Sequence, residues 1–188
     1  MAQPDRPLRA DAVRNRARVL EVAYEALATE GVSVPIDEIA RRAGVGAGTV
    51  YRHFPTKEAL FGAVVEDRLQ QIVTASRALL ETDDPGEAFF VFIRGIVNEG
   101  AVDLSLAQAL AGYGIDVKVV APEAEADFLG LLGDLLSAAQ RAGTARPEVS
   151  VPEVKAVIVG CQAAQAYNPD VAEQVTEIVI NALRATPR

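Results

Sequence analysis

The side chains with the greatest capacity for chemistry are concentrated between residues 46 and 54. A short helix in this segment would bury Val50 and Phe54 on one side, and each residue turns a helix by about 100°. The opposite side then carries a hydroxyl, a phenol and a guanidinium group, which suit contacts with phosphates and base edges. The residues on this side are Gly48, Thr49, Tyr51 and Arg52.

Three neighbouring residues add to this surface. Gly48 lacks a side chain at the point where such a helix would approach a nucleic acid most closely. Lys57 lies in the first turn of the next expected helix, where backbone amides also favour a phosphate. His53 is the one histidine of the chain, and taken alone it would be an ordinary surface or core residue.

The spacing around Gly44 is that of a helix-turn-helix. Ala40 lies four residues before this glycine and permits close helix contact, while Val50 lies six residues after it and packs beneath the turn. The element that must position the polar face is therefore the second helix of such a pair. Spacing alone does not exclude an ordinary helical hairpin.

A longer motif favours the helix-turn-helix over the ordinary helical hairpin. Residues 44–60, GVGAGTVYRHFPTKEAL, and the preceding IDEIARRAG of residues 36–44 resemble the signature of the TetR/AcrR family of bacterial transcriptional repressors. The close resemblance covers about residues 14–60; beyond it only the length and the helical layout agree. It implies a homodimer with two recognition helices in successive major grooves of an inverted-repeat operator.

The resemblance also implies particular contacts with double-stranded DNA. Members often carry Ser-Lys where this chain has Gly46 and Ala47, so base discrimination would rest on Arg52, Thr49 or DNA shape. Phosphate contacts are implied for Thr49, Tyr51, His53 and Lys57, and approach to bases for Ala47 and Gly48. The arginines of the first helix, Arg14, Arg16 and Arg18, would either touch the DNA backbone or form a solvated face.

Composition and charge exclude several classes of protein. The net charge is −8, but residues 1–62 carry nine basic against eight acidic residues, so DNA binding requires that the basic residues share one face. One cysteine and one histidine leave no metal site, and no cofactor is expected. No apolar run reaches the roughly 18 residues of a membrane span, and the chain has no signal-peptide pattern, so a cytoplasmic protein is expected.

Hydrophobic spacing predicts an all-α fold of about nine helices. We expect an N-terminal three-helix helix-turn-helix head, joined by one long helix to a larger helical domain. The predicted domains are a disordered tail at 1–13, a DNA-binding domain at 14–58 and an effector-binding and dimerisation domain at 59–188. The helices are predicted near residues 11–30, 36–43, 46–54, 56–81, 84–96, 103–111, 122–143, 150–164 and 168–183.

The resemblance implies that the second domain binds a small effector, which we expect to be apolar or aromatic. A pocket there would have mostly apolar walls with one or two amides inside, although each candidate residue could equally belong to an ordinary core. The candidates are Phe92, Ile96, Leu106, Leu110, Tyr113, Phe128, Gln162 and Gln165.

Stripes of short side chains on the last two helices are expected to form the homodimer interface, with intramolecular core as the alternative. Cys161 belongs to this set and is expected to be a small buried apolar residue. The interface candidates are Val154, Val157, Ile158, Cys161, Val171, Val175, Ile178 and Val179.

These patterns, together with what the resemblance to TetR/AcrR regulators implies, predict a repressor that a small molecule releases from its operator. A helical regulator with a protein effector, or with no effector, remains an alternative. An all-α enzyme is much less favoured, because no nucleophile–base pair, phosphate loop or metal motif is present in the sequence.

Overall fold

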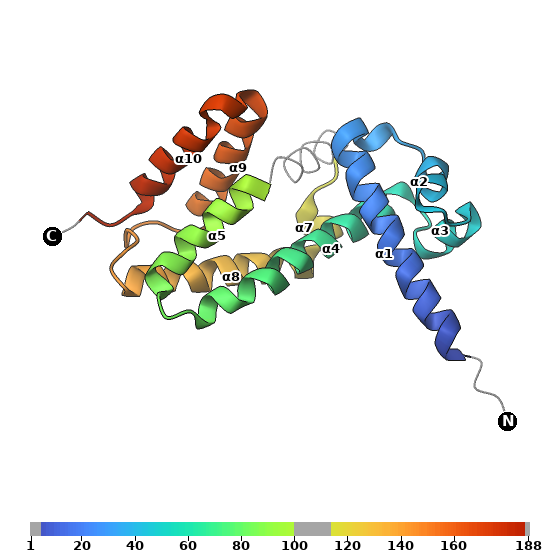
Figure 1. Ribbon diagram of the computed structural model, residues 1–188, viewed down its shortest axis with the longest axis horizontal. Helices are drawn as coiled ribbons and strands as arrows, with labels where there is room; N and C mark the ends of the chain where they lie inside the picture. Colours follow the sequence, from blue (N-terminus) through green and yellow to red (C-terminus); the bar gives the residue numbers. More distant parts are fainter. Residues whose placement is uncertain (1–4, 100–113, 187–188) are drawn as a thin grey trace. The chain divides into compact units, whose positions relative to one another are not determined.

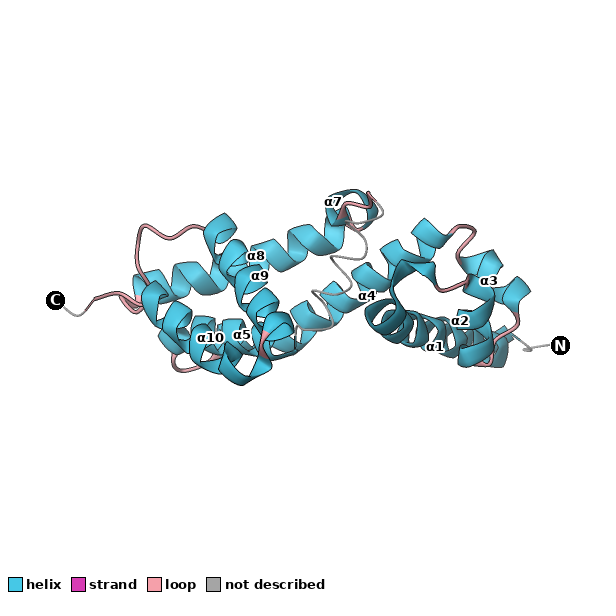
Figure 2. Cartoon of the chain, turned by 90° about the horizontal axis from the view of Figure 1, so that it is seen from above, coloured by secondary structure: helices cyan, strands magenta, loops and turns pink. Residues whose placement is uncertain are grey.

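Every regular element in the described part of the chain is a helix, as the sequence predicts (Figure 1, Figure 2). The computed structural model describes residues 5–99 and 114–186. The chain divides into two compact units, which we call unit 1 (Met1–Arg68 with Ser105–Pro122) and unit 2 (Leu69–Leu104 with Glu123–Arg188). The division falls inside a helix, whereas the sequence places the domain boundary at residue 58.

Unit 1 holds the predicted head. Its helices are α1 (Asp5–Glu30), η1 (Gly31–Ser33), α2 (Ile36–Ala43), α3 (Ala47–His53), the first part of α4 (Lys57–Ser76) and α7 (Val117–Val120). Helices α1, α2 and α3 pack on one another around a buried core that includes Leu20, Leu27, Ile39 and Val50. The four-residue helix α7 is too short for hydrophobic spacing to reveal.

Helix α1 begins earlier than expected. It starts at Asp5, so the prediction of a disordered tail over residues 1–13 is wrong for residues 5–13. Alanine, leucine and arginine favour a helix in this segment, and Pro7 lies in the first turn, where its missing N–H costs no hydrogen bond. The additional turns place several arginines on regular helix.

Unit 2 contains the rest of α4 and the helices that follow it. They are η2 (Arg77–Glu81), α5 (Pro85–Glu99), α8 (Pro122–Arg141), α9 (Val151–Tyr167) and α10 (Pro169–Leu183). The helix predicted over 56–81 is not uniform, because it tightens into a 3₁₀ segment at Arg77. The helix predicted at 103–111 lies outside the described residues.

The helix starts follow local capping chemistry. The Thr56 hydroxyl accepts a hydrogen bond from the Ala59 amide at 3.1 Å, and Asp84 accepts one from Glu87 at 3.0 Å. Ser150 and Glu153 form the predicted capping box at the start of α9. These short-range bonds explain why the helix starts could be located from sequence.

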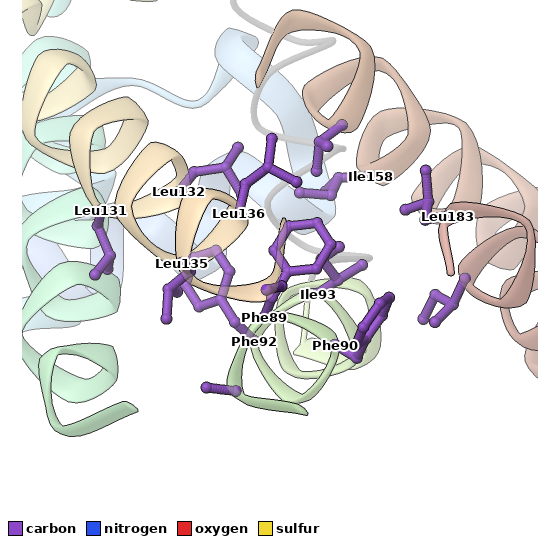
Figure 3. Close-up of a cluster of buried hydrophobic side chains, with 14 of the residues drawn as sticks. Phe89, Phe90, Phe92, Ile93, Leu131, Leu132, Leu135, Leu136, Ile158 and Leu183 are labelled. Carbon is purple, nitrogen blue, oxygen red and sulfur yellow. The ribbon is translucent and has the colours of Figure 1, made fainter. Parts of the chain in front are cut away.

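The core of unit 2 is formed by α5, α8, α9 and α10, together with Ile72 and Val73 at the end of α4 (Figure 3). Phe89 and Phe90 are fully buried, with ring centroids 5.1 Å apart in an edge-to-face arrangement. Leucines of α8, including Leu132 and Leu135, pack against them. Helices α9 and α10 form an antiparallel hairpin beside α5 (Figure 1). This packing leaves the outer side of the hairpin exposed.

Candidate functional site

The turn between α2 and α3 requires a glycine. Gly44 adopts φ +66° and ψ 29°, a left-handed conformation that costs a residue with a side chain about 1–2 kcal/mol. The Val45 amide donates to the Ala40 carbonyl at 3.0 Å and closes the end of α2. Ala40 is 1% exposed, so a small side chain is needed where the helices meet. This geometry is the helix-turn-helix that the spacing predicts.

Helix α3 is anchored by its apolar side. Val50 is 1% exposed and Phe54 is 3% exposed, so both lie in the core of unit 1. The Thr49 amide donates to the Gly46 carbonyl at 2.8 Å, which starts the helix without a side-chain cap. The Phe54 amide donates to Val50 at 2.8 Å, which ends it. The burial of these two residues fixes the direction of the opposite face.

The opposite face of α3 is exposed to solvent, and its polar side chains form no ion pairs with the described residues. Tyr51 exposes 44% of its surface, and Gly48, Arg52 and His53 are exposed as well. Among the described residues, none of these side chains has an ion-pair partner. Ala47 and Thr49 are half-buried at the edge of the same face. The face therefore offers hydrogen-bond donors that remain available to a partner.

Lys57 lies in the first turn of α4, close to the end of α3. Its ammonium group lies 5.8 Å from the centroid of the Phe61 ring, and the residue is half-buried. The Thr56 cap precedes it, so backbone amides and a lysine meet at one helix start. All seven residues predicted to contact DNA are thus on α3 or at the start of α4.

The arginines of α2 are engaged within unit 1. Arg41 and Arg42 both donate to Glu38, and Arg42 also pairs with Glu30 at the end of α1. Their hydrogen bonds lower the pKa of Glu38 from 4.5 to about 2. Bonds to Glu30 and Glu38 raise the pKa of Arg42. This network connects α1 to α2 and orients the helix that precedes the turn.

Comparison with known proteins agrees with this geometry. Residues 19–64 match the family described as bacterial regulatory proteins, tetR family, and residues 84–185 match the family described as transcriptional regulator SbtR-like, C-terminal domain. A solved TetR transcription regulatory protein from Mycobacterium vanbaalenii is 57% identical with a TM-score of 0.76, and the match covers 95% of this chain and 100% of that chain. The chain belongs to the TetR family of transcriptional regulators.

Two further relatives are similar to this TetR-family protein. A solved TetR transcriptional regulator from Streptomyces coelicolor is 29% identical with a TM-score of 0.70, covering 92% of this chain and 99% of that one. An HTH-type transcriptional regulator of Staphylococcus aureus is 38% identical over 68 residues, and the match spans only 36% of this chain and 37% of that protein. The TetR-family protein is a DNA-binding regulator of transcription with a helix-turn-helix, not an enzyme.

The predicted effector-pocket residues of the TetR-family protein lie mostly within its core. Phe92 and Phe128 are buried, with their ring centroids 6.1 Å apart, so each fills space beside the other. Gln162 is 6% exposed and donates to the Ile96 carbonyl at 3.2 Å. Ile96 and Gln165 are half-buried. The other three candidates, Leu106, Leu110 and Tyr113, lie outside the described residues.

Unit 2 has a groove that the sequence analysis missed. It has a volume of about 370 Å³ and lies between the end of α4 with η2 and one side of α8. Its residues are Val73, Arg77, Leu80, Glu81, Ala126, Asp127, Gly130, Leu131 and Asp134. The residues come from two segments about fifty positions apart, and charged residues alternate with apolar ones, so neither segment shows a pocket pattern by itself.

The predicted interface residues of the TetR-family protein divide into two groups. Val154, Ile158 and Cys161 on α9 are at most 4% exposed and belong to the core of unit 2, so they present no surface to a partner. Burial also raises the pKa of the Cys161 thiol. Val157 is half-buried against the same core.

Of the α10 candidates, Val179 also packs against the core of unit 2, whereas Val171 and Ile178 are turned to the surface. Val171 is 46% exposed and Ile178 is 62% exposed, while Val175 and Val179 are half-buried. On α9 the exposed apolar residues are instead Val159, at 45%, and Tyr167, at 91%. We call the set Val159, Tyr167, Val171, Val175 and Ile178 the outer hairpin face. The exposed stripe on α9 was missed because short apolar residues occupy both sides of that helix.

The described part of the TetR-family protein contains neither a cluster of metal-ligating side chains nor a membrane-spanning helix. No group of three or more metal-ligating side chains occurs among residues 5–99 and 114–186. Within the same ranges no helix is long and apolar enough to cross a membrane.

Proposed function

We propose that this TetR-family regulator is a homodimeric repressor that binds an inverted-repeat operator in double-stranded DNA. The observation that carries the proposal is the exposed face of α3. Tyr51, Arg52 and His53 form no ion pair there with any described residue, while Val50 and Phe54 hold the helix in the core. Two such helices would enter successive major grooves, about 34–36 Å apart.

Within this proposal the residues of α3 have different tasks. Phosphate contacts, which fix the register of the protein on the duplex, come from Thr49, Tyr51 and His53 of α3 and from Lys57 at the start of α4. Ala47 and Gly48 offer no hydrogen bonds from their side chains, so direct readout falls to Arg52 and Thr49. Arginine reads guanine through paired donors, which favours a guanine in each half-site.

Dimerisation would use the outer hairpin face. Val159, Val171 and Ile178 each expose close to half of their surface or more, and Tyr167 is almost fully exposed. An apolar set of this kind on two neighbouring helices suits a twofold four-helix contact. The dimer supplies the second recognition helix that an inverted repeat requires.

The groove of unit 2 is the proposed effector site. Its walls combine apolar residues such as Val73 and Leu131 with charged ones such as Arg77 and Asp127. These walls suit a small molecule with an apolar body and polar groups rather than a purely apolar one. Helix α4 runs from Lys57 beside α3 to Ser76 beside the groove, so it connects the two by unbroken helix. Release from DNA then requires that the effector bind the DNA-incompetent form more tightly.

The proposed location is the cytoplasm, where DNA is accessible to a bacterial repressor. The one cysteine, Cys161, is free and buried, which is consistent with a reducing compartment.

The experiment that tests the proposal is selection of genomic fragments by the purified protein, followed by binding measurements at two salt concentrations. A recovered palindrome with steep salt dependence supports the operator model, and its half-site spacing gives the head separation. In the same assay we expect Tyr51→Phe to weaken binding to all duplexes alike, because it removes one hydroxyl from a phosphate contact. Absence of any enriched palindrome, together with full binding by Tyr51→Phe, would refute the proposed role of α3.

A further inference from the structure

The first half of α1 is rich in arginine. Between residues 5 and 18 it carries five arginines and two aspartates. Arg14 pairs with Asp11, three residues earlier on the same helix. Arg16 and Arg18 are exposed and have no carboxylate partner among the described residues. Within the described part of the chain, Arg16 and Arg18 therefore carry positive charges that no carboxylate balances.

The register of α1 separates these arginines into two groups. Leu20, Ala23 and Leu27 form the buried stripe of the helix, which faces α2 and α3. Position 16 lies four residues before Leu20 and seven before Ala23, so Arg16 continues this stripe. Positions 14 and 18 are each two residues, about 200°, from position 16 and lie on the opposite side.

Contacts confirm the placement of Arg16. Its guanidinium carbon lies 5.7 Å from the centroid of the Phe54 ring. Phe54 directly follows His53, the last residue of α3, and the two rings have centroids 6.1 Å apart. Arg16 therefore holds a cation at the carboxyl end of α3. In Figure 1 the first turns of α1 continue beyond α2 and α3.

We infer that Arg16 supplies a DNA-backbone contact from α1 beside the recognition helix, and that Arg14 and Arg18 do not. This inference rests on the proposed contact between α3 and DNA. The guanidinium group is planar and matches a phosphate with paired donors, and stacking on Phe54 restricts its motion before DNA arrives.

The partner is the sugar–phosphate backbone rather than base edges. Arg16 lies beyond the end of α3 and outside its exposed face, whose residues approach the groove. A cation that contacts a phosphate next to that face adds affinity without adding sequence preference. The contact would therefore strengthen operator and non-specific binding by the same factor.

The test compares Arg16→Met with Arg18→Met. Methionine keeps an apolar stem against Phe54 but removes the charge, and Arg18 is the matched control on the opposite side of the same helix. Binding to a labelled mixed-sequence duplex is measured by fluorescence anisotropy between about 50 and 200 mM salt. We expect Arg16→Met to lower the slope of log K against log salt by about 0.9 per bound protomer, and Arg18→Met to leave it unchanged.

Two further variants distinguish a charge contact of Arg16 from a packing role, and the inference from the proposed role of α3. Arg16→Lys retains the charge and is expected to keep the salt slope; an equal loss of slope in Arg16→Lys would show a packing role and overturn the inference. An unchanged slope in Arg16→Met, or equal losses in Arg16→Met and Arg18→Met, would also overturn it. Tyr51→Phe is measured in parallel. If Tyr51→Phe binds more weakly and Arg16→Met keeps the wild-type salt slope, only the inference about Arg16 is refuted. If both variants bind as tightly as the wild type, the proposed role of α3 is refuted as well.

Discussion

The outer hairpin face provides a quantitative prediction about assembly, which we test with Ile178→Asp. Ile178 exposes 62% of its surface. Full burial of an isoleucine side chain is worth about 1.5–3 kcal/mol, so covering the exposed part is worth about 1–2 kcal/mol per copy. A twofold interface contains the residue twice, which gives about 2–4 kcal/mol per dimer.

This free energy corresponds to a dimer dissociation constant raised roughly 30- to 700-fold. The introduced carboxylates add a desolvation penalty, so the estimate is a lower bound. We expect sedimentation equilibrium over a concentration series to show dimers for the wild type and monomers for Ile178→Asp at the same concentrations. Operator affinity falls in parallel, because one protomer offers only one recognition helix.

The matched control is Val91→Asp. Val91 lies on α5 of the same unit and is 48% exposed, so it is an apolar surface residue outside the outer hairpin face. It should remain dimeric with a melting temperature close to that of the wild type, and Ile178→Asp should keep the helical circular-dichroism signal of the wild type, which shows that its monomer is folded. Wild-type self-association of Ile178→Asp, or equal dissociation of both variants, would refute the assignment of the interface to α9 and α10.

Two predictions concern the stability of unit 1. The pKa of Glu38 lies at about 2, below its ordinary 4.5, so the stabilisation from its bonds to Arg41 and Arg42 is complete above pH 4.5 and is lost as the pH falls toward 2. Thermal unfolding as a function of pH should therefore show a smaller acid-induced drop in melting temperature for Glu38→Gln than for the wild type; identical profiles would contradict this. Gly44→Ala and Gly48→Ala both place a methyl group in open space, but only Gly44 has a positive φ. Denaturant unfolding should show a loss of about 1–2 kcal/mol for Gly44→Ala and a gain of about 0.5–1 kcal/mol for Gly48→Ala, and a shared sign would count against the backbone explanation.

The helix-turn-helix could be predicted because its signals are short-range. The left-handed turn at Gly44, the cap at Thr56 and the burial of Val50 all depend on residues within a few positions of one another. The resemblance to TetR regulators rests on the same contiguous segment. For these reasons the exposed face of α3 was located correctly from sequence, although its contacts with DNA remain a prediction.

The second unit shows where sequence patterns are ambiguous. Helix α9 has short apolar residues on two sides, so spacing selected Val154 and Ile158, which the core uses, and missed Val159 and Tyr167. Helix α10 is more strongly one-sided, and the interface candidate Ile178 is exposed there, although its role in a dimer remains a prediction. Hydrophobic spacing identifies an apolar face but does not show whether it meets its own chain or another copy.

The sequence by itself determined the all-α fold, most helix starts and the polar face of α3, because each depends on bonds and side-chain directions within one or two turns. Only the tertiary structure decided which arginine of α1 lies beside α3, which side of α9 is buried and which segments form the groove. Those features depend on contacts between residues tens of positions apart. Chain packing sets such contacts, and no local pattern specifies them.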